Sequence, residues 1–353
     1  MTTRKLRVGV VGAGGIARSQ HFPNWKTLPD VAITTLCDIR EEAAKEAARQ
    51  FQIPNVFTRY QDVVSRDDVD VVDVCTPNRA HTPVVLAALS AGKHVLCEKP
   101  LATTTAEVIR MGRLADKKRL VLMTAQHQRF SPGAKALHEF ATGGLGHVYH
   151  ARVHATRRTL LPAWGGFIDK KLSGGGPCMD IGVHALDLAL WLMNFPTPVR
   201  VSGSAKVNFA RGNIIPGGWG EWDRKRFSVE DFAAGFIHFS NGATMILESS
   251  WLSHQKDDEE MSATLYGIKA SLHWPTGEFW STRGRSLTDG VVKSAQRSGR
   301  KAHAEEIAAF HDAVVNRRPS PVPWRQTVRV IGILEAIYRS SETGREISLK
   351  LPE

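Results

Sequence analysis

One glycine-rich stretch decides the fold of this chain: Leu6-Arg-Val-Gly-Val-Val-Gly-Ala-Gly-Gly-Ile-Ala17. Its first half is the apolar, β-branched run of a buried strand. The second half fits the pattern G-x-G-x-x-G/A between a predicted strand and a predicted helix, which is the context that the motif requires. Gly12 permits a tight turn, Gly14 lets the backbone approach a pyrophosphate, and Ala17 lets helix and strand pack closely. We therefore predict a dinucleotide-binding turn, completed by Gly15 and Ile16; a structural turn that binds no phosphate is the alternative.

The next acidic residue indicates which dinucleotide binds. Asp38 ends the following predicted strand, 32–37, where a ligand of a ribose hydroxyl is expected. A carboxylate accepts hydrogen bonds from a 2′-hydroxyl and repels a 2′-phosphate, so we expect NAD. Arg40 lies two residues further on and could reach a 2′-phosphate, which keeps NADP as the less favoured alternative.

The first third of the chain alternates short apolar runs with amphipathic or alanine-rich stretches. This rhythm is typical of a doubly wound parallel sheet in an α/β protein, so we predict a Rossmann domain over residues 1–125. The predicted strands are 6–11, 32–37, 69–75, 94–97 and 120–123, and the predicted helices include 41–51, 81–91 and 104–115.

The remainder, residues 126–353, is predicted to form a second α/β domain that binds substrate and makes subunit contacts. Long strand-like segments dominate it, and Asn241-Gly242 between two of them is a strong hairpin signal. We expect a large, open, mostly antiparallel sheet with helices on one face, and a homodimer or homotetramer that covers the other face. The predicted strands are 148–154, 199–209, 232–239, 243–251 and 261–266. Helices are predicted at 303–317 and 324–342, and the second is expected to pack back on the Rossmann domain. Long loops are predicted at 210–226 and 283–301, and loops of this length are typical of lids or subunit contacts.

A second stretch, 174–187, places three polar residues in an apolar run. Asp180, His184 and Asp187 follow three glycines and Pro177, a residue preorganised for the first position of a helix. At positions 0, +4 and +7 they share one stripe of an α-helix whose other residues are mostly leucine, isoleucine and valine. A carboxylate and an imidazole one turn apart can hold a polar substrate and take its proton, and a core hydrogen bond is the alternative.

The composition is that of a globular protein of 353 residues, with 42% hydrophobic and 23% charged residues. The net charge is +11, but the basic residues occur in small groups between acidic ones, which indicates a solvated surface and no nucleic-acid partner. The four cysteines lack the spacing of metal ligands, so we predict free thiols and no metal site. No apolar run approaches the roughly 20 residues of a membrane span, and the start has no signal-peptide core, so we expect a cytoplasmic protein without a membrane partner.

Further motifs along the chain carry a family resemblance. Cys75-Thr-Pro-Asn78 is followed by His81, Glu98-Lys-Pro100 follows the fourth predicted strand, and Asp180 and His184 have the spacing D-x-x-x-H. Together with the glycine turn, these motifs show that the chain resembles the Gfo/Idh/MocA oxidoreductases, a family of mostly sugar and polyol dehydrogenases. The resemblance covers nearly the whole length and implies a Rossmann domain followed by an α/β domain with a large open sheet.

The resemblance also implies roles for individual residues. It places Lys99, Asp180 and His184 at catalytic and substrate-contacting positions, and it implies a cis peptide bond before Pro100. Residues that it places around the cofactor's nicotinamide end are Thr76, Pro77, Asn78, His81, Glu98 and Lys99.

The chemistry that fits these residues is the oxidation of a secondary alcohol, in which a hydride leaves carbon for the nicotinamide and the hydroxyl proton goes to a base. Lys99 would stabilise the developing alkoxide, and His184 would be the general base because its usual pKa lies near working pH. Asp180 would orient His184 or bind a neighbouring hydroxyl, and Asp187 is assigned a structural role.

Softer candidates lie in the predicted second domain. His127 and Arg129 follow the last Rossmann strand and are candidate substrate contacts. An aromatic wall against a sugar ring is a hypothesis for Trp164, Trp219, Trp222 and Trp251, although core packing is as common a role for tryptophan. The substrate is expected to be a small carbohydrate or polyol. A redox-neutral enzyme that cleaves or isomerises a glycoside with retained NAD, and an NAD-binding sensor without activity, are the alternatives.

Overall fold

The computed structural model describes residues 5–294 and 301–352. These residues form two compact units. The first unit comprises the described parts of 1–102, 106–130 and 300–327, and the second those of 103–105, 131–299 and 328–353.

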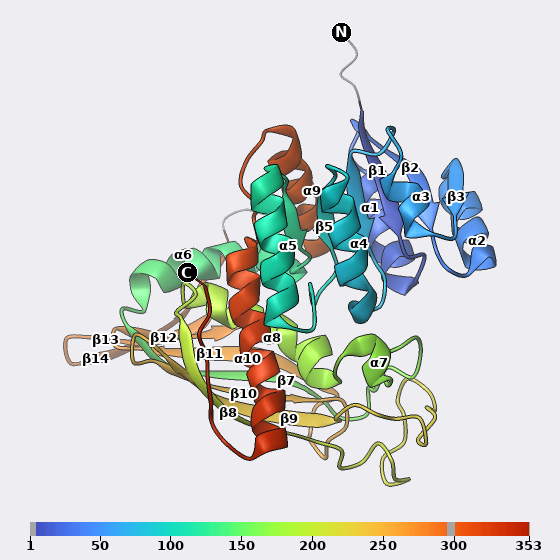
Figure 1. The fold of residues 1–353 in the computed structure, drawn as a ribbon. Helices are drawn as coiled ribbons and strands as arrows, with labels where there is room; N and C mark the ends of the chain where they lie inside the picture. Colours follow the sequence, from blue (N-terminus) through green and yellow to red (C-terminus); the bar gives the residue numbers. More distant parts are fainter. Residues whose placement is uncertain (1–4, 295–300, 353) are drawn as a thin grey trace. The chain divides into compact units, whose positions relative to one another are not determined.

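A parallel sheet of six strands forms the centre of the first unit, in the order β3-β2-β1-β4-β5-β6 (Figure 1). The order reverses between β1 and β4, the point at which doubly wound sheets bind their ligands beyond the carboxyl ends of the strands. The predicted doubly wound fold is therefore confirmed. The strands are β1 (Leu6–Val11), β2 (Val31–Cys37), β3 (Asn55–Phe57), β4 (Val71–Val74), β5 (His94–Cys97) and β6 (Leu122–Thr124).

Helices connect these strands, and most of them lie within one to three residues of the predicted ranges. Sequence patterns gave no indication that a short π-helix, η1, follows the glycine turn. The helices of this part of the chain are η1 (Ala17–His21), α1 (Phe22–Lys26), α2 (Glu41–Phe51), α3 (Tyr60–Val64), α4 (Asn78–Ser90), α5 (Thr105–Lys118), η2 (His127–Phe130) and α9 (Ala302–Val315).

Helix α9 belongs to the first unit although it comes from the C-terminal part of the chain. Its Phe310 packs edge-on against Trp25 of α1, with ring centroids 6.1 Å apart, and Ile307 is buried in the same core. Burying side chains of this size contributes about 1.5–3 kcal/mol each. The sequence analysis expected one continuous domain from 126 to 353, with the helix near 324–342 packing back. The structure instead groups 300–327 with the first unit, and α10 (Trp324–Thr343) lies in the second unit from Val328 onward.

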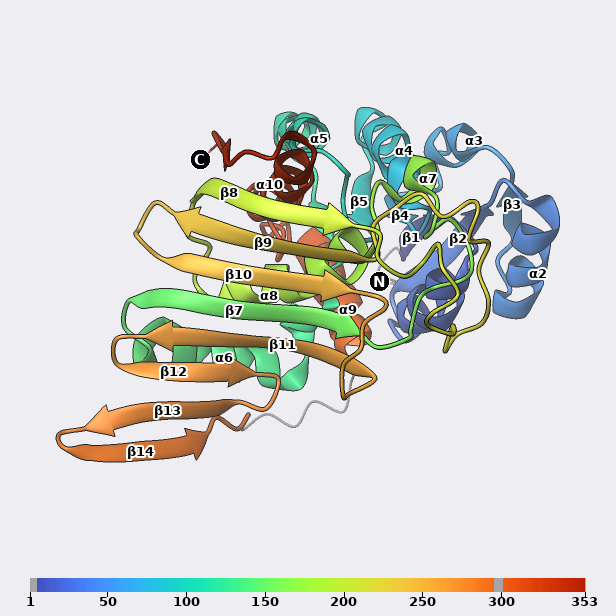
Figure 2. The ribbon, with the colours of Figure 1, turned by 90° about the horizontal axis from the view of Figure 1, so that it is seen from below.

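A nine-stranded sheet forms the second unit, in the order β14-β13-β12-β11-β7-β10-β9-β8-β15 (Figure 2). All neighbours are antiparallel except β7 and β10, so the predicted open, mostly antiparallel sheet is confirmed. The predicted hairpin at Asn241-Gly242 joins β9 to β10, with φ of 85° at Gly242. The strands are β7 (Val148–Arg157), β8 (Pro198–Lys206), β9 (Phe232–Phe239), β10 (Thr244–Ser250), β11 (Glu259–Gly267), β12 (Ala270–Trp274), β13 (Glu278–Arg283), β14 (Ser286–Val291) and β15 (Ile347–Ser348).

Helices cover one face of this sheet. A Cβ atom at Gly203 or Gly235 would collide with Ile337, so these glycines let α10 lie directly on β8 and β9. The view in Figure 2 is of the opposite face, and the half-exposed side chain of Phe236 lies on it because it alternates with the buried Gly235 and Ile237. The helices of the second unit are α6 (Pro132–Gly144), α7 (Lys170–Ser173), η3 (Cys178–Gly182), α8 (Val183–Leu192) and the larger part of α10.

One predicted loop is partly wrong. The loop predicted over 283–301 begins as a hairpin of β13 and β14, in which Thr282 pairs with Leu287. Polar residues and glycines dominate this exposed hairpin, so its sequence has the composition of a loop. The end of the predicted loop, 295–300, lies outside the described residues.

Candidate functional site

The glycine turn of the first unit has the shape that the sequence predicts. Gly12 has φ of 107°, and a Cβ atom there would overlap the carbonyl oxygen of Cys75, so only glycine fits. At Gly14 and Gly15 a Cβ atom would meet nothing within 4 Å. The backbone of the turn therefore borders open space, as a pyrophosphate cradle requires. Ile16 and the buried Ala17 lead from the turn into η1.

Asp38 holds this turn in place. Its Oδ2 accepts a hydrogen bond from the backbone N–H of Ala13 at 2.9 Å, and its Oδ1 accepts one from the N–H of Arg40 at 2.9 Å. The guanidinium Nε of Arg40 lies 3.5 Å from Oδ1. A carboxylate offers about four lone-pair positions, so these bonds leave acceptors for a ribose hydroxyl. Between these residues, Ile39 is 89% exposed, and the sequence analysis did not single it out.

One imidazole ties together the loops that follow β4 and β5. His81, in the first turn of α4, lies 2.8 Å through Nε2 from the carbonyl oxygen of Thr76 and 2.8 Å through Nδ1 from that of Pro100. Pro77 is the N-cap of α4, which begins at Asn78, and the Lys99–Pro100 peptide bond is cis, as the resemblance implies. The side chain of His81 is fully buried, so the structure gives it the task of holding two loops.

A buried charged triad supports the Glu98–Lys99 loop. His21 of η1 lies 2.8 Å through Nδ1 from Oδ2 of Asp73 on β4, and 2.9 Å through Nε2 from Oε1 of Glu98. Trp25 donates its indole N–H to the same Asp73 oxygen at 2.7 Å. The other Glu98 oxygen, Oε2, accepts the backbone N–H of Lys99 at 3.0 Å. The triad therefore fixes the backbone from which Lys99 projects.

The electrostatics of the triad favour an imidazolium between two carboxylates. Burial lowers the pKa of His21, but the charge and hydrogen bond of Asp73 together with those of Cys75 outweigh burial and hold this pKa well above its usual value. Burial raises the pKa of Glu98, but the hydrogen bond and charge of His21 outweigh it and lower the pKa to about 2. At neutral pH Glu98 is ionised, and its negative charge lies beside Lys99.

His21, Asp73 and Cys75 also bring three potential metal ligands within 4.8 Å of one another. Burial raises the pKa of Cys75 to about 12, so the group that faces Oδ1 of Asp73 at 3.7 Å is a thiol that donates a hydrogen bond. Both carboxylate oxygens of Asp73 are hydrogen-bonded within the group, Oδ2 to His21 and Oδ1 to Cys75. In the structure these three residues therefore form a hydrogen-bonded core cluster.

His127 and Arg129 lie in η2 and differ from each other in environment. The His127 ring stacks on His303 with centroids 4.1 Å apart, and burial lowers the pKa of His127 to about 3, so it is neutral at working pH. Arg129 is buried and donates from Nη1 to Oε1 of Gln326 at 2.6 Å. That bond anchors η2 to the first turn of α10, a structural task that the sequence pattern did not indicate.

In the second unit, Asp180 and His184 lie on a helix whose start differs from the prediction. The first turn, η3, is π-helical, and α8 begins at Val183. Asp180 therefore lies in the π-helical turn, and His184 and Asp187 lie in α8. Asp180 and His184 retain slight exposure, whereas Asp187 is buried.

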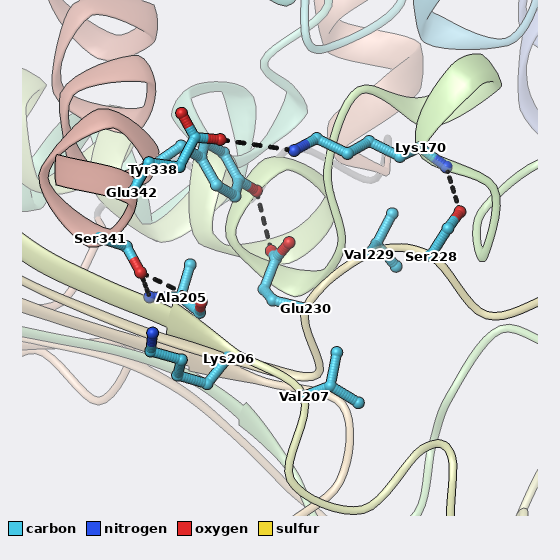
Figure 3. Close-up of a pocket in the computed structure, with 10 residues that line it drawn as sticks. All are labelled: Lys170, Ala205, Lys206, Val207, Ser228, Val229, Glu230, Tyr338, Ser341 and Glu342. Atoms are coloured by element: carbon cyan, nitrogen blue, oxygen red, sulfur yellow. Dashed lines mark hydrogen bonds and ion pairs between the residues drawn. The ribbon is translucent and has the colours of Figure 1, made fainter.

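The carboxylate of Glu230 anchors the start of this helix by accepting backbone N–H groups. Its Oε2 accepts the N–H of Gly176 at 2.9 Å, and its Oε1 accepts the N–H of Cys178 at 3.1 Å. The hydroxyl of Tyr338 also donates to Oε1 at 2.8 Å (Figure 3). Cβ atoms at Gly175 and Gly176 would overlap Tyr338 and the Glu230 backbone. The glycine run is thus needed for close approach, in addition to starting the helix.

Asp180 receives two contacts through its Oδ2 atom. The indole N–H of Trp251 donates to it at 3.2 Å, and Nη1 of Arg157 lies 3.9 Å away. Arg157 also pairs through Nε with Glu259 at 2.6 Å, and its guanidinium lies 4.7 Å from the ring centre of Trp219. The sequence analysis missed Arg157, because only the pairing of β7 with β11 brings it to Glu259.

The four tryptophans of the predicted aromatic wall separate into two pairs. Trp222 is buried and donates its indole N–H to the carbonyl oxygen of Ala210 at 2.7 Å, and Trp251 is fully buried. Trp164 and Trp219 are 54% and 40% exposed, with ring centroids 5.4 Å apart. Only the second pair can meet a ligand in the structure as it stands.

An open cavity of about 430 Å³ lies next to Glu230 and Tyr338 (Figure 3). Lys170 and Glu342 face each other across it at 3.6 Å. Neither Asp180 nor His184 lines it, so this cavity is separate from the candidate catalytic side chains. The lining residues are Lys170, Ala205, Lys206, Val207, Ser228, Val229, Glu230, Tyr338, Ser341 and Glu342.

Comparison with known proteins identifies the family. Residues 6–126 match the model of the oxidoreductase family with an NAD-binding Rossmann fold, and residues 140–349 match the C-terminal alpha/beta domain of the same Gfo/Idh/MocA family. The chain belongs to this family. Its first unit is accordingly an NAD-binding Rossmann domain, and the resemblance drawn from the motifs is confirmed.

Relatives in this family act on sugars. D-glucoside 3-dehydrogenase of Escherichia coli (strain K12) is 33% identical over 351 residues, which are 99% of each chain. Levoglucosan dehydrogenase of Pseudarthrobacter phenanthrenivorans is 26% identical over 298 residues, 76% of this chain and 73% of that protein. A levoglucosan dehydrogenase solved with NADH and levoglucosan has the same fold, with a TM-score of 0.84 at 22% identity, covering 99% of this chain and 100% of that one. Among the described residues, no helix is both long and apolar enough to cross a membrane.

Proposed function

We propose that the protein is an NAD-dependent oxidoreductase that transfers a hydride between the nicotinamide and a secondary hydroxyl of a sugar, sugar derivative or cyclic polyol. The observation that carries the proposal is the likeness, over 99% of both chains, to D-glucoside 3-dehydrogenase. The presence of Lys99, Asp180 and His184 in this chain supports it.

The cofactor contacts follow from the first unit. Gly12 makes the tight turn, Gly14 and Gly15 border open space for the pyrophosphate, and Asp38 offers its remaining acceptors to the ribose hydroxyls. Arg40 is engaged with Asp38, which favours NAD over NADP because a 2′-phosphate would have to displace that pair. The remaining contacts of the proposed cofactor site are Ile16, Ala17, Thr76, Pro77, Asn78, Glu98 and Lys99, with His81 acting through the loops that it joins.

The chemistry assigned to the side chains has three parts. When bound, NAD supplies the hydride acceptor. Lys99 places a fixed positive charge where the alkoxide develops, and the buried Glu98 and His21 hold its backbone. His184 takes the hydroxyl proton, and Asp180, held by Trp251 and Arg157, orients the imidazole or binds a neighbouring hydroxyl. His127 is a neutral donor or acceptor toward substrate.

The activity test uses NAD and a panel of methyl glycosides, free hexoses, glucosides and inositols, and follows nicotinamide absorbance together with chromatography of the sugar. At least one member should be oxidised with formation of NADH, and Lys99→Met and His184→Asn should each lose most of that activity. Lys117→Met, an exposed lysine at the end of α5, is the matched control and should retain full activity. Full activity in both site variants would refute the assigned roles.

Two outcomes of the same test favour the alternatives. A changed sugar without NADH would indicate a redox-neutral reaction with retained NAD. Binding of NAD without conversion of any sugar would favour a sensor.

We further propose that the open face of the nine-stranded sheet joins subunits into a homodimer or homotetramer. Strand register places Phe236, Ile246 and Arg152 in one row across β9, β10 and β7 on that face. A neighbouring row holds Tyr266, over which Arg152 lies at 5.7 Å. Light scattering of the wild type and of Phe236→Glu should show an oligomer and a smaller species, and two monomers would contradict the proposal.

A further inference from the structure

Two half-exposed indoles lie side by side in loops of the second unit. Trp164 comes from the segment between β7 and α7, and Trp219 from the long segment between β8 and β9. Their ring centroids are 5.4 Å apart and the ring planes are tilted by 43°, so neither ring covers the other face to face. Contiguous exposed apolar side chains, unlike single ones, are a feature of ligand-binding surfaces.

Two independent sets of contacts connect this pair to Asp180. Trp219 lies 4.7 Å from the guanidinium of Arg157, whose Nη1 is 3.9 Å from Asp180 Oδ2. Trp164 meets Phe167 edge-on at 6.5 Å, Phe167 meets Trp251 edge-on at 6.5 Å, and the Trp251 indole donates to the same Asp180 oxygen. The exposed pair is therefore continuous with the carboxylate to which we assign substrate binding.

The composition of this surface fits a carbohydrate. Tryptophan faces pack against the apolar C–H faces of sugar rings and against aromatic aglycones, while the polar end of the site takes hydroxyls. Arg157 offers guanidinium N–H donors between the indoles and Asp180. Two indoles that are 54% and 40% exposed offer much less than the roughly 800 Å² that each partner contributes to a stable contact between two copies of this chain.

We propose that Trp164 and Trp219 form a stacking subsite for the part of a glycoside that lies beyond the oxidised ring, either a second sugar ring or an aromatic aglycone. The proposal rests on the proposed function, and it narrows the substrate class to glycosides. A ligand held here makes the same contacts before and during hydride transfer. The subsite therefore lowers KM and leaves kcat unchanged.

The test compares Trp164→Ala, Trp219→Ala and the double variant with the wild type, using methyl β-D-glucopyranoside as the short probe and phenyl β-D-glucopyranoside and cellobiose as the long probes. Loss of an aromatic contact of ordinary strength should raise KM for the long probes about 10-fold in the double variant. KM for the short probe and kcat for all probes should stay within about twofold of the wild type, the range expected when no contact to them is lost. Ile268→Ala is the control, since Ile268 is an exposed apolar residue (69%) in the turn that joins β11 to β12.

Each possible result either supports the stacking subsite or favours another role for the two tryptophans. Equal KM changes for short and long probes, or a changed oligomeric state on light scattering of the double variant, would overturn the subsite and indicate a structural or subunit contact. Oxidation of free sugars or inositols in preference to every glycoside would overturn it while leaving the proposed function intact. If no probe is oxidised, the proposed function fails, and quenching of tryptophan fluorescence by phenyl β-D-glucopyranoside still decides the subsite. Equal quenching in the wild type and the double variant would then exclude it.

Discussion

The buried triad of the first unit yields a prediction whose size follows from its contacts. Asp73→Asn keeps the volume of the side chain but removes the charge that faces His21 at 2.8 Å, and its Oδ2 also accepts from Trp25 at 2.7 Å. The histidine and the aspartate are almost completely excluded from water. Breaking a buried ion pair from one side costs about 3–5 kcal/mol, and an isosteric amide that still accepts one hydrogen bond should lie near the lower end, about 3 kcal/mol.

A matched control lies at the start of the same strand. Asp70 pairs with Arg7 through bonds of 2.9 and 2.8 Å, but the two side chains are 27% and 22% exposed. Solvent screening reduces such pairs to about 1 kcal/mol or less, so Asp70→Asn should cost roughly a third of Asp73→Asn. Urea unfolding of the full chain, followed by circular dichroism, measures both. If Asp73→Asn lowers the free energy of unfolding no more than Asp70→Asn does, His21 and Asp73 do not form a buried ion pair.

The difference in stability between the wild type and Asp73→Asn should change with pH in a defined direction. The pKa of His21 is raised in the folded state, so its contribution is complete below the usual value of 6.5 and is lost as pH rises through the higher folded value. The pKa of Glu98 is lowered to about 2, so its contribution is present above 4.5 and is lost as pH falls toward that value. The stability difference between wild type and Asp73→Asn should therefore be greatest between pH 4.5 and 6.5. A difference that grows steadily from pH 6.5 to 9 would refute the protonated state of His21.

Three further predictions concern single residues. Glu230→Ala leaves three donors without an acceptor and should lower the free energy of unfolding by about 3 kcal/mol or more, whereas Tyr338→Phe should lower it by about 1 kcal/mol. Urea unfolding measures both, and equal losses would contradict the role of Glu230 in anchoring the start of the helix. Asp38→Asn should raise KM for NAD about 10-fold, because the hydrogen bond to the glycine turn and the proposed contact with the ribose both weaken. An unchanged affinity in NAD titrations would exclude Asp38 from the cofactor site. The NMR titration of His127 should show a pKa of about 3, and a value near 6.5 would contradict its burial.

The fold was predictable where local pattern and long-range structure agree. The β-branched runs and the glycine turn define the strands that form the parallel sheet, and Asn241-Gly242 marks the hairpin of the second sheet. The spacing of polar residues within the apolar run of η3 and α8 also indicated the candidate residues Asp180 and His184. The anchoring of this helix start was not predictable, since Glu230, which accepts the Cys178 N–H, lies 52 residues away in sequence.

The parts that sequence reasoning missed depend on pairing between distant segments. Arg157 meets Glu259 through the register of β7 with β11, and it meets Asp180 through the packing of η3 on β7. His21 meets Asp73 across 52 residues, although a carboxylate inside an apolar strand was a signal that something buried must balance its charge. Trp222 and Trp251 differ from Trp164 and Trp219 only in burial, which no local pattern distinguishes.

The central claim is hydride transfer from a sugar carbon. It is tested most directly by a single turnover of excess enzyme with NAD and a glucoside deuterated at every ring carbon, followed by mass spectrometry of the nicotinamide and of the sugar. We predict that the reduced nicotinamide carries one deuterium and that the sugar has gained a carbonyl group. A converted sugar with no deuterium in the nicotinamide would contradict the account.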